Sequence, residues 1–189
     1  APPGPDAPIE DRWIASRLQR AIEEIAGDLE RYDFSHAALE LYRFFWSEFC
    51  DWYLEIAKPR LYERDPGVSA TLLWALEQTL ALAHPLIPFV TEEIYRYLRE
   101  LAPGERAEML VVHPFPEADP SLVDEAAEAE LERWIELTRD VRRWRDLVGV
   151  PAGAVLPARV AGDGPTPHEL VARLARLRLG EDGGEVLAT

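Results

Sequence analysis

The chain has 189 residues, 48% of them hydrophobic and 29% charged, so it can bury a core large enough for one domain. Its 20 Lys and Arg side chains are outnumbered by 35 Asp and Glu side chains, which gives a formal net charge of −15. This composition excludes global disorder, and it disfavours general nucleic-acid binding, because phosphate contacts need a positive surface. Any contact with a nucleic acid therefore has to use a local patch.

Three further features bear on location. No run approaches the roughly 20 uncharged apolar residues that a membrane-spanning helix needs. The first eight residues, APPGPDAP, contain neither the basic nor the apolar segment of a signal peptide. The single cysteine, Cys50, excludes an intramolecular disulfide and fits a reducing compartment. We therefore expect a cytoplasmic protein that does not interact with membranes.

Residues 1–8 are predicted to be a linker, because four prolines and one glycine in eight positions cannot sustain a helix. A first helix is predicted from about Ile9, since apolar residues then recur every three or four positions. The residues of this apolar stripe are Ile14, Leu18, Ile22, Ile25 and Leu29.

A second helix is predicted to begin at Asp33 or Ser35, either of which can cap it, and to run to about residue 57, where Pro59 helps to end it. Its predicted apolar stripe consists of Ala38, Leu41, Phe45, Phe49, Trp52 and Ile56. Residues 63–67, with the sequence ERDPG, are a strong turn signal. The third helix, over about 69–83, is apolar nearly all round, which predicts the most buried helix of the fold.

A fourth helix is predicted over residues 89–101, with Phe89, Ile94 and Leu98 in the core, and residues 109–112 are predicted to be extended. A fifth helix is predicted over about 121–148. Its acidic run, from residue 124 to 132, is interpreted as a solvated face.

The composition changes from Gly149 onward. Strand-like pieces are predicted within 150–157, a turn at 162–165, a short amphipathic helix over 168–179 and a last strand at 185–187. The predicted fold is therefore mainly α: an antiparallel helical bundle over residues 9–148, followed by a small C-terminal α/β appendage over 149–189.

The sequence contains no catalytic or metal-binding constellation. It lacks a Gly-rich phosphate loop, and none of its histidines (His36, His84, His113 and His168) follows a Glu at the spacing of helical di-metal sites. Asp33 and His36 are interpreted as a helix cap beside a solvated histidine. Cys50 is interpreted as a buried small apolar residue. We therefore predict a chain that has no catalytic residues, no metal site and no cofactor of its own.

Two stretches of the chain carry a specific resemblance. Residues 49–59 read FCDWYLEIAKP, and residues 83–94 read AHPLIPFVTEEI. Both resemble the anticodon-binding helical domain of the valyl-tRNA synthetase family, which belongs to the class I aminoacyl-tRNA synthetases. The opening residues 11–18 and the VVHPFP segment at 111–116 are similar to the same family, and the likeness is collinear over roughly residues 9–160.

This resemblance implies an RNA-recognition module of a larger enzyme. The parent joins valine to its tRNA with ATP and Mg²⁺, and its catalytic and editing domains have no counterpart in this chain. The resemblance therefore implies two kinds of partner for the module: a valine-accepting tRNA, through its anticodon stem-loop, and those other domains of the parent.

Unpaired RNA loops are recognised by stacking bases on aromatic or Arg side chains and by contacting the backbone with cations. The residues that we predict to contact RNA are Lys58, Arg60, Tyr62, Arg64, Arg142, Arg145, Arg12 and Arg17. For the group from Lys58 to Arg64, the alternative is a basic cap at a helix C-terminus. For Arg142 and Arg145, the alternative is pairing within the helix, and for Arg12 and Arg17 it is a solvated face.

A second function stays open at this point, namely an acidic helical domain that binds proteins or acts as a scaffold. The two functions differ in what they require of the cations. RNA binding requires an open positive surface with exposed rings, whereas a scaffold predicts that the same cations are consumed in ion pairs. The aromatic residues expected to pack in the core are Trp46, Trp52, Tyr53, Trp74 and Trp134.

Overall fold

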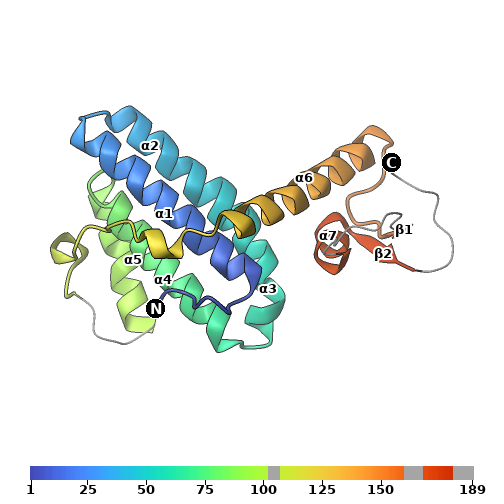
Figure 1. Cartoon of the computed structure of the whole chain (residues 1–189), viewed down its shortest axis with the longest axis horizontal. Helices are drawn as coiled ribbons and strands as arrows, with labels where there is room; N and C mark the ends of the chain where they lie inside the picture. The colour runs from blue at the N-terminus through green and yellow to red at the C-terminus, as the bar shows by residue number, and fades with distance from the viewer. Residues whose placement is uncertain (102–106, 160–167, 181–189) are drawn as a thin grey trace. The chain divides into compact units, whose positions relative to one another are not determined.

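The computed structural model describes residues 1–101, 107–159 and 168–180, and most of the regular structure in these ranges is helical (Figure 1). The chain divides into two compact units, Ala1–Glu128 and Ala129–Thr189. The predicted mainly α fold with a small α/β piece near the C-terminus is confirmed. In the described part of the chain, no helix is both long and apolar enough to cross a membrane.

The first unit is built around α1 (Ile9–Glu30), which packs against α2, α4 and two short helical segments. Eleven of its 22 residues are buried, whereas α4 (Pro66–Ala83) buries eight of 18. The prediction that α4 is the most buried helix is therefore wrong. Apolar residues surround α4, but not all of them are covered by other elements. Leu72, Trp74 and Leu76 are only half-buried.

The predicted second helix is a continuous run of three parts: α2 (Phe34–Tyr42), the π-helical segment η1 (Arg43–Leu54) and α3 (Glu55–Tyr62). Wider π-turns have i→i+5 hydrogen bonds, and they shift the buried stripe. Phe44 and Phe49, five residues apart, are buried, Phe45 is only half-buried, and Ala37 is buried in place of the predicted Ala38.

Pro59 lies inside α3, so the prediction that it ends the helix is wrong. An internal proline removes one hydrogen bond and costs about 3 kcal/mol. The residues around it offset that cost, because Ile56 and Ala57 are buried and Arg60 is held by three carboxylates. The predicted turn follows, and α4 starts at Pro66 because the carboxylate of Asp65 accepts the N–H of Gly67 at 2.7 Å.

Helix α5 (Pro88–Leu101) buries Thr91, Tyr95 and Leu98. Phe89, predicted to be in the core, is 92% exposed, and Ile94 is 41% exposed, because the buried stripe lies on another side of the helix. Residues 110–112, predicted to be extended, form the short 3₁₀ turn η2 (Leu110–Val112).

The segment η2 is held against α5 by Glu92. Both carboxylate oxygens of Glu92 accept the backbone N–H of Leu110 at 3.1 Å. Leu110 is buried beside Tyr95 and Leu98 in one apolar cluster. A side chain at the start of α5 thus fixes a turn 18 residues later.

Helix α6 (Glu125–Leu147) begins four residues later than predicted. The 3₁₀ turn η3 (Pro120–Leu122) precedes it and is capped by Asp119. Asp124 then caps α6, because its Oδ1 accepts the N–H of Ala127 at 2.9 Å.

The second unit contains most of α6, the short helix α7 (His168–Ala175) and two parallel strands, β1 (Leu156–Ala158) and β2 (Leu177–Leu179). Leu156 pairs with Leu177. The predicted helix over 168–179 therefore ends at Ala175, and its last residues form a strand instead. The predicted turn at 162–165 and strand at 185–187 lie outside the described residues.

Candidate functional site

Arg60, one of the predicted RNA contacts, lies at a junction of three carboxylates. Its Nη1 lies 2.9 Å from Glu10 Oε1, and its Nη2 lies 2.9 Å from Asp11 Oδ2. Its Nε donates to Asp65 Oδ2 at 2.8 Å. Because Glu10 and Asp11 belong to α1 and Asp65 caps α4, Arg60 of α3 connects three helices.

The same cluster includes a buried tyrosine. Asp11 is almost fully buried, and its Oδ1 accepts a 2.8 Å hydrogen bond from the hydroxyl of Tyr53, which is fully buried. Burial and the nearby charge of Asp11 raise the pKa of Tyr53, so its hydroxyl stays protonated and donates. We call Glu10, Asp11, Tyr53, Arg60 and Asp65 the Arg60 cluster.

The charge of Arg60 is fixed by its surroundings. Burial by itself would lower the pKa of Arg60, but hydrogen bonds to Asp11 and Asp65 outweigh it and raise the pKa above its ordinary value. Its side chain is only 20% exposed. The guanidinium therefore joins the three helices, and little of its surface is accessible to a partner.

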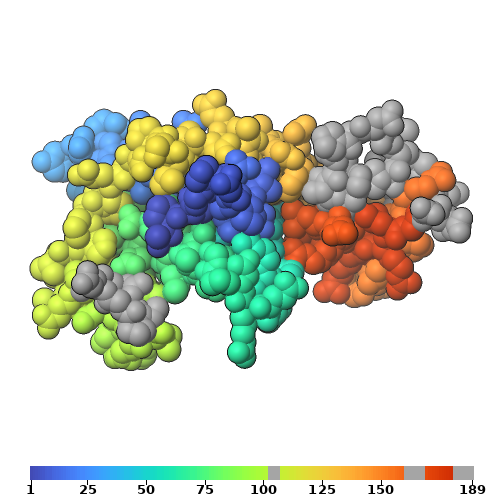
Figure 2. Space-filling view, turned by 60° about the horizontal axis from the view of Figure 1, so that its bottom comes forward, coloured from blue at the N-terminus to red at the C-terminus, as the bar shows by residue number. Residues whose placement is uncertain are grey.

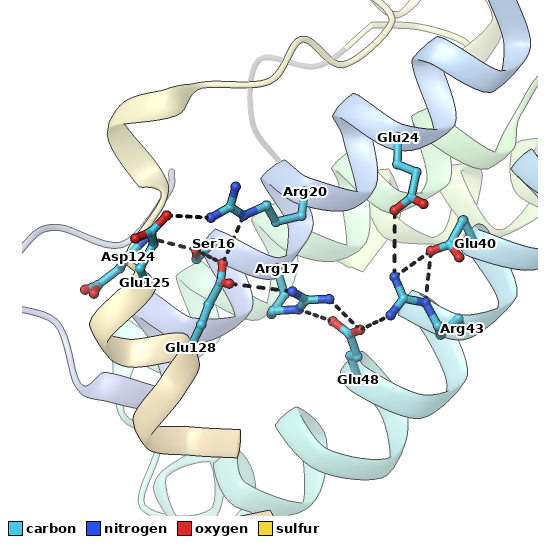
Figure 3. Close-up of polar contacts among 10 residues, drawn as sticks. All are labelled: Ser16, Arg17, Arg20, Glu24, Glu40, Arg43, Glu48, Asp124, Glu125 and Glu128. Carbon is cyan, nitrogen blue, oxygen red and sulfur yellow. Dashed lines mark hydrogen bonds and ion pairs between the residues drawn. The ribbon is translucent and has the colours of Figure 1, made fainter. Parts of the chain in front are cut away.

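A second polar cluster connects α1 to η1 and to the start of α6 (Figure 3). Arg17 of α1 donates twice to Glu48 of η1, from Nε at 2.8 Å and from Nη2 at 3.0 Å. Its Nη1 lies 3.6 Å from Glu128. Paired donors of this kind match the two oxygens of a carboxylate, which makes the geometry specific.

Two further arginines extend this cluster on either side, as Figure 3 shows. Arg20 of α1 lies 3.4 Å from Glu128. Arg43 of η1 lies 2.6 Å from Glu40 and 3.7 Å from Glu48. Cations and carboxylates therefore alternate along one side of α1.

The start of α6 completes the same cluster. Arg12 contacts the carboxylate of Asp124, and its Nε donates to the carbonyl oxygen of Ala7 at 3.1 Å. Ser16 donates its hydroxyl hydrogen to Glu128 and accepts the backbone N–H of Asp124 at 2.9 Å. The interpretation of the acidic run as a solvated face is thus wrong for Asp124 and Glu128, because arginines of α1 face them.

The sequence contains one signal for these partners. Asp11 falls in register with Ala15, Leu18 and Ile22, so a carboxylate occupies the buried stripe of α1 and requires a buried cation. Sequence reasoning misses Glu48 and Glu128, because their arginines lie on other elements and no spacing predicts the contact.

In the second unit, Arg145 is only 5% exposed and serves as a donor to backbone carbonyls. It donates to Pro151 (3.2 Å), Ala154 (2.7 Å), Ala175 (3.2 Å) and Arg176 (3.2 Å). These bonds tie the end of α7 and the loop after α6 to α6 itself.

Arg142, one turn earlier on α6, acts on the same helix end. It donates to the carbonyl oxygen of Leu174 from Nη2 at 2.9 Å and from Nε at 3.2 Å. A cation beside the last carbonyls of α7 also complements the negative end of the helix dipole. Unlike Arg145, Arg142 is exposed, so part of it faces solvent.

The last turns of α3 and the turn that follows it contain the remaining predicted contacts. Tyr62 is 82% exposed, and Arg64 is exposed with a positive φ of 60°. Neither has a side-chain partner among the residues that the structure describes. Lys58 is exposed and pairs with Glu55, one turn before it on the same helix. The chain around residues 60–65 projects from the molecular surface in Figure 2.

The other candidate polar residues have structural partners. Asp33 accepts the N–H of His36 at 3.1 Å, which confirms the predicted cap. His84 bonds to Thr91 at 2.9 Å between their side chains. Cys50 is only half-buried, so the interpretation of it as a buried residue is only partly confirmed; burial raises the pKa of its thiol. Among the described residues, no group of three or more His, Cys, Asp or Glu side chains could hold a metal ion.

The expectation that the aromatic residues pack in the core is only partly confirmed. Trp52 and Tyr53 are buried, and Trp74 and Trp134 are half-buried. Trp46 is 50% exposed, so the prediction is wrong for it. The π-helical turns of η1 rotate Trp46 away from the buried side.

Comparison with known proteins identifies the family. Residues 11–160 match the family described as the anticodon-binding domain of tRNA ligase. The chain belongs to this family, and the predicted resemblance is confirmed.

The relatives are more specific than the family. A valine–tRNA ligase of Dechloromonas aromatica is 38% identical over 182 residues, covering 92% of this chain and 19% of that protein. A valine–tRNA ligase of Thermotoga maritima is 37% identical over 160 residues, covering 84% and 18%. One of Caulobacter vibrioides is 39% identical over 172 residues, covering 89% and 18%. The chain thus spans about a fifth of the length of these relatives.

Proposed function

We propose that the chain is the tRNA-recognition module of a longer valine–tRNA ligase and that it holds the anticodon stem-loop of a valine-accepting tRNA. The observation that carries the proposal is the likeness to valine–tRNA ligases at 37–39% identity over most of the chain. In the proposed parent enzyme, valine reacts with ATP, assisted by Mg²⁺, at other domains. The module contributes binding and tRNA identity.

The geometry divides the predicted RNA contacts into two groups. Lys58 and Tyr62 of α3 and Arg64 of the turn after it are exposed, and we propose that they touch the RNA directly. We propose a separate RNA contact for Arg142 in the second unit, through the part of its side chain that faces solvent. A ring beside two cations suits a nucleic acid, because the ring stacks on a base while the cations meet phosphates.

The second group acts indirectly in this proposal. Arg12, Arg17, Arg60 and Arg145 are held by carboxylates or backbone carbonyls. Their role is to fix the helices that present the exposed residues. This pairing is what a scaffold domain would also show, and the family match is what favours RNA over that alternative.

A binding measurement at low salt tests the proposal. We expect the 189-residue chain to bind a valine tRNA more tightly than the same tRNA with its anticodon loop exchanged. The affinity should fall as salt rises, because phosphate contacts release counterions. Equal affinity for the two RNAs would contradict anticodon recognition, and binding of neither would favour the scaffold function.

A further inference from the structure

In the part of the chain that the structure describes, helices α1, α3 and α6 end in the same motif. At the ends of α1, α3 and α6, an N–H bonds to the carbonyl oxygen five residues earlier: Asp33 to Asp28 (2.8 Å), Asp65 to Arg60 (2.9 Å) and Val150 to Arg145 (2.9 Å). The residue before each of these donors has a positive φ, as this type of helix end requires.

The residues at the positive-φ position differ between the three ends. Helix α6 has Gly149 there, with a φ of 72°, and glycine adopts this conformation without steric cost. Helix α1 has Tyr32 and α3 has Arg64, each with a φ of 60°. A bulky side chain in this conformation is strained, and such strain gathers at functional positions.

The side chain of Tyr32 packs little against the rest of the fold. Tyr32 is 81% exposed, and its ring lies edge-to-face with that of Phe34, at 6.3 Å between ring centroids. Phe34 is itself 54% exposed. Both rings are therefore largely accessible to a partner at this turn.

The two strained turns lie near opposite ends of α1. Arg60, on the last turn before Arg64, pairs with Glu10 and Asp11 at the N-terminal end of α1, whereas Tyr32 follows its C-terminal end. At ~1.5 Å per residue, the 22 residues of α1 extend roughly 33 Å. The turns are thus separate surfaces: Tyr32 and Phe34 lie at one, and Lys58, Tyr62 and Arg64 lie at the other.

We propose that Tyr32 and Phe34 form a stacking platform for an unpaired base of the RNA loop, while the turn at Arg64 contacts the RNA backbone. This inference rests on the proposed function and adds a second stacking surface, at the other end of α1 from Tyr62. Any base has a face that stacks on an aromatic ring, and exposed rings at a helix end need no rearrangement to receive it.

The experiment compares variants of the chain for binding to a labelled anticodon stem-loop, measured by fluorescence anisotropy over a series of salt concentrations. Tyr32→Gly should weaken binding about fivefold or more, the loss of one stacked base. Its salt dependence should stay unchanged, because no phosphate contact is removed. Tyr32→Phe should bind like the original chain, since the ring is kept.

Arg64→Gly is the contrasting variant, because it should weaken binding and lower the slope of log affinity against log salt by about one. Tyr42→Ser is the matched control: it removes a tyrosine that is 61% exposed on α2, and affinity should not change. A hairpin with the same stem and a fully stacked short loop should lose its sensitivity to Tyr32→Gly.

Folding is measured in parallel. The Tm of Tyr32→Gly should be unchanged or higher, because glycine relieves the strain at positive φ. A Tm lowered by several degrees would mean that the ring serves the fold, and it would overturn the inference. Undiminished binding by Tyr32→Gly, or an equal loss in Tyr42→Ser, would overturn it as well while leaving the proposed function intact. If the original chain bound neither the anticodon stem-loop nor the short-loop hairpin, both this inference and the proposed function would be overturned.

Discussion

Arg60 and Arg64 are four residues apart at one end of α3, yet the fold uses them in opposite ways. Arg60 is 20% exposed and bound by carboxylates of two other helices, whereas Arg64 is exposed without a side-chain partner among the described residues. The difference shows that local charge does not identify an RNA contact in an acidic chain. Most arginines among the described residues of the first unit pair with carboxylates, and few cations are left for a partner.

The largest expected effect is the loss of stability when the buried cluster around Arg60 is disrupted. Asp11→Ala would leave Arg60 and Tyr53 without their shared acceptor inside the first unit. Removing one partner of a buried ion pair typically costs 3–5 kcal/mol, so we expect a loss of about 3 kcal/mol in the free energy of unfolding. Urea denaturation measures it. Asp51→Ala, at an exposed position of η1, is the control and should change stability by less than about 0.5 kcal/mol.

The next largest effect is a difference in stability between variants of Arg60 and Arg64. Arg60→Ala should lower the free energy of unfolding by about 2 kcal/mol, because three carboxylates lose their cation. Arg64→Ala should leave stability within about 0.5 kcal/mol. The same denaturation experiment measures both. Similar stability for the two variants would remove the distinction between a structural and an exposed arginine.

A smaller effect is expected in the cluster between α1, η1 and α6. Glu48→Gln keeps the shape of the side chain but removes the charge that pairs with Arg17 and Arg43. We expect a loss of about 1 kcal/mol, since the pair is partly solvated. Glu23→Gln, at an exposed position of α1, is the control. A wild-type melting curve for Glu48→Gln would show that the cluster adds no stability.

The smallest effect depends on pH. The hydrogen bond from Arg60, then that from the N–H of Gly67, lowers the pKa of Asp65 below its ordinary value. A carboxylate with a lowered pKa in the folded state adds stability above its unfolded pKa, near 3.9, and loses it as the pH falls through the folded value. The stability difference between the original chain and Asp65→Asn should therefore be constant from about pH 5 to 7 and shrink below pH 4. A difference that grows on acidification would contradict this assignment.

How far the sequence could predict these features depends on how local their causes are. The helices were predictable because the apolar stripe of α1 and the caps at Asp33 and Asp65 are short-range signals. The π-helical turns of η1 were not, because the stripe was assumed to follow the α-helical period. The internal Pro59 was also missed, since tertiary contacts offset its local cost.

The candidate site was less predictable than the fold. The sequence placed cations at both Arg60 and Arg64, but only the structure shows that Glu10 and Asp11, some 50 residues away, hold Arg60. It also gave no reason to notice Tyr32, whose importance depends on a backbone angle and an exposed ring. Carboxylates that are distant in sequence determine which cationic side chains stay exposed and can contact RNA.

Chemical footprinting of a valine tRNA in complex with this chain tests the central claim most directly. The account predicts that the nucleotides of the anticodon loop and the adjoining stem become protected, and that Tyr32→Gly removes protection from a loop base while the stem stays covered. Protection confined to the acceptor end of the tRNA, or no protection where binding is saturated, would contradict it.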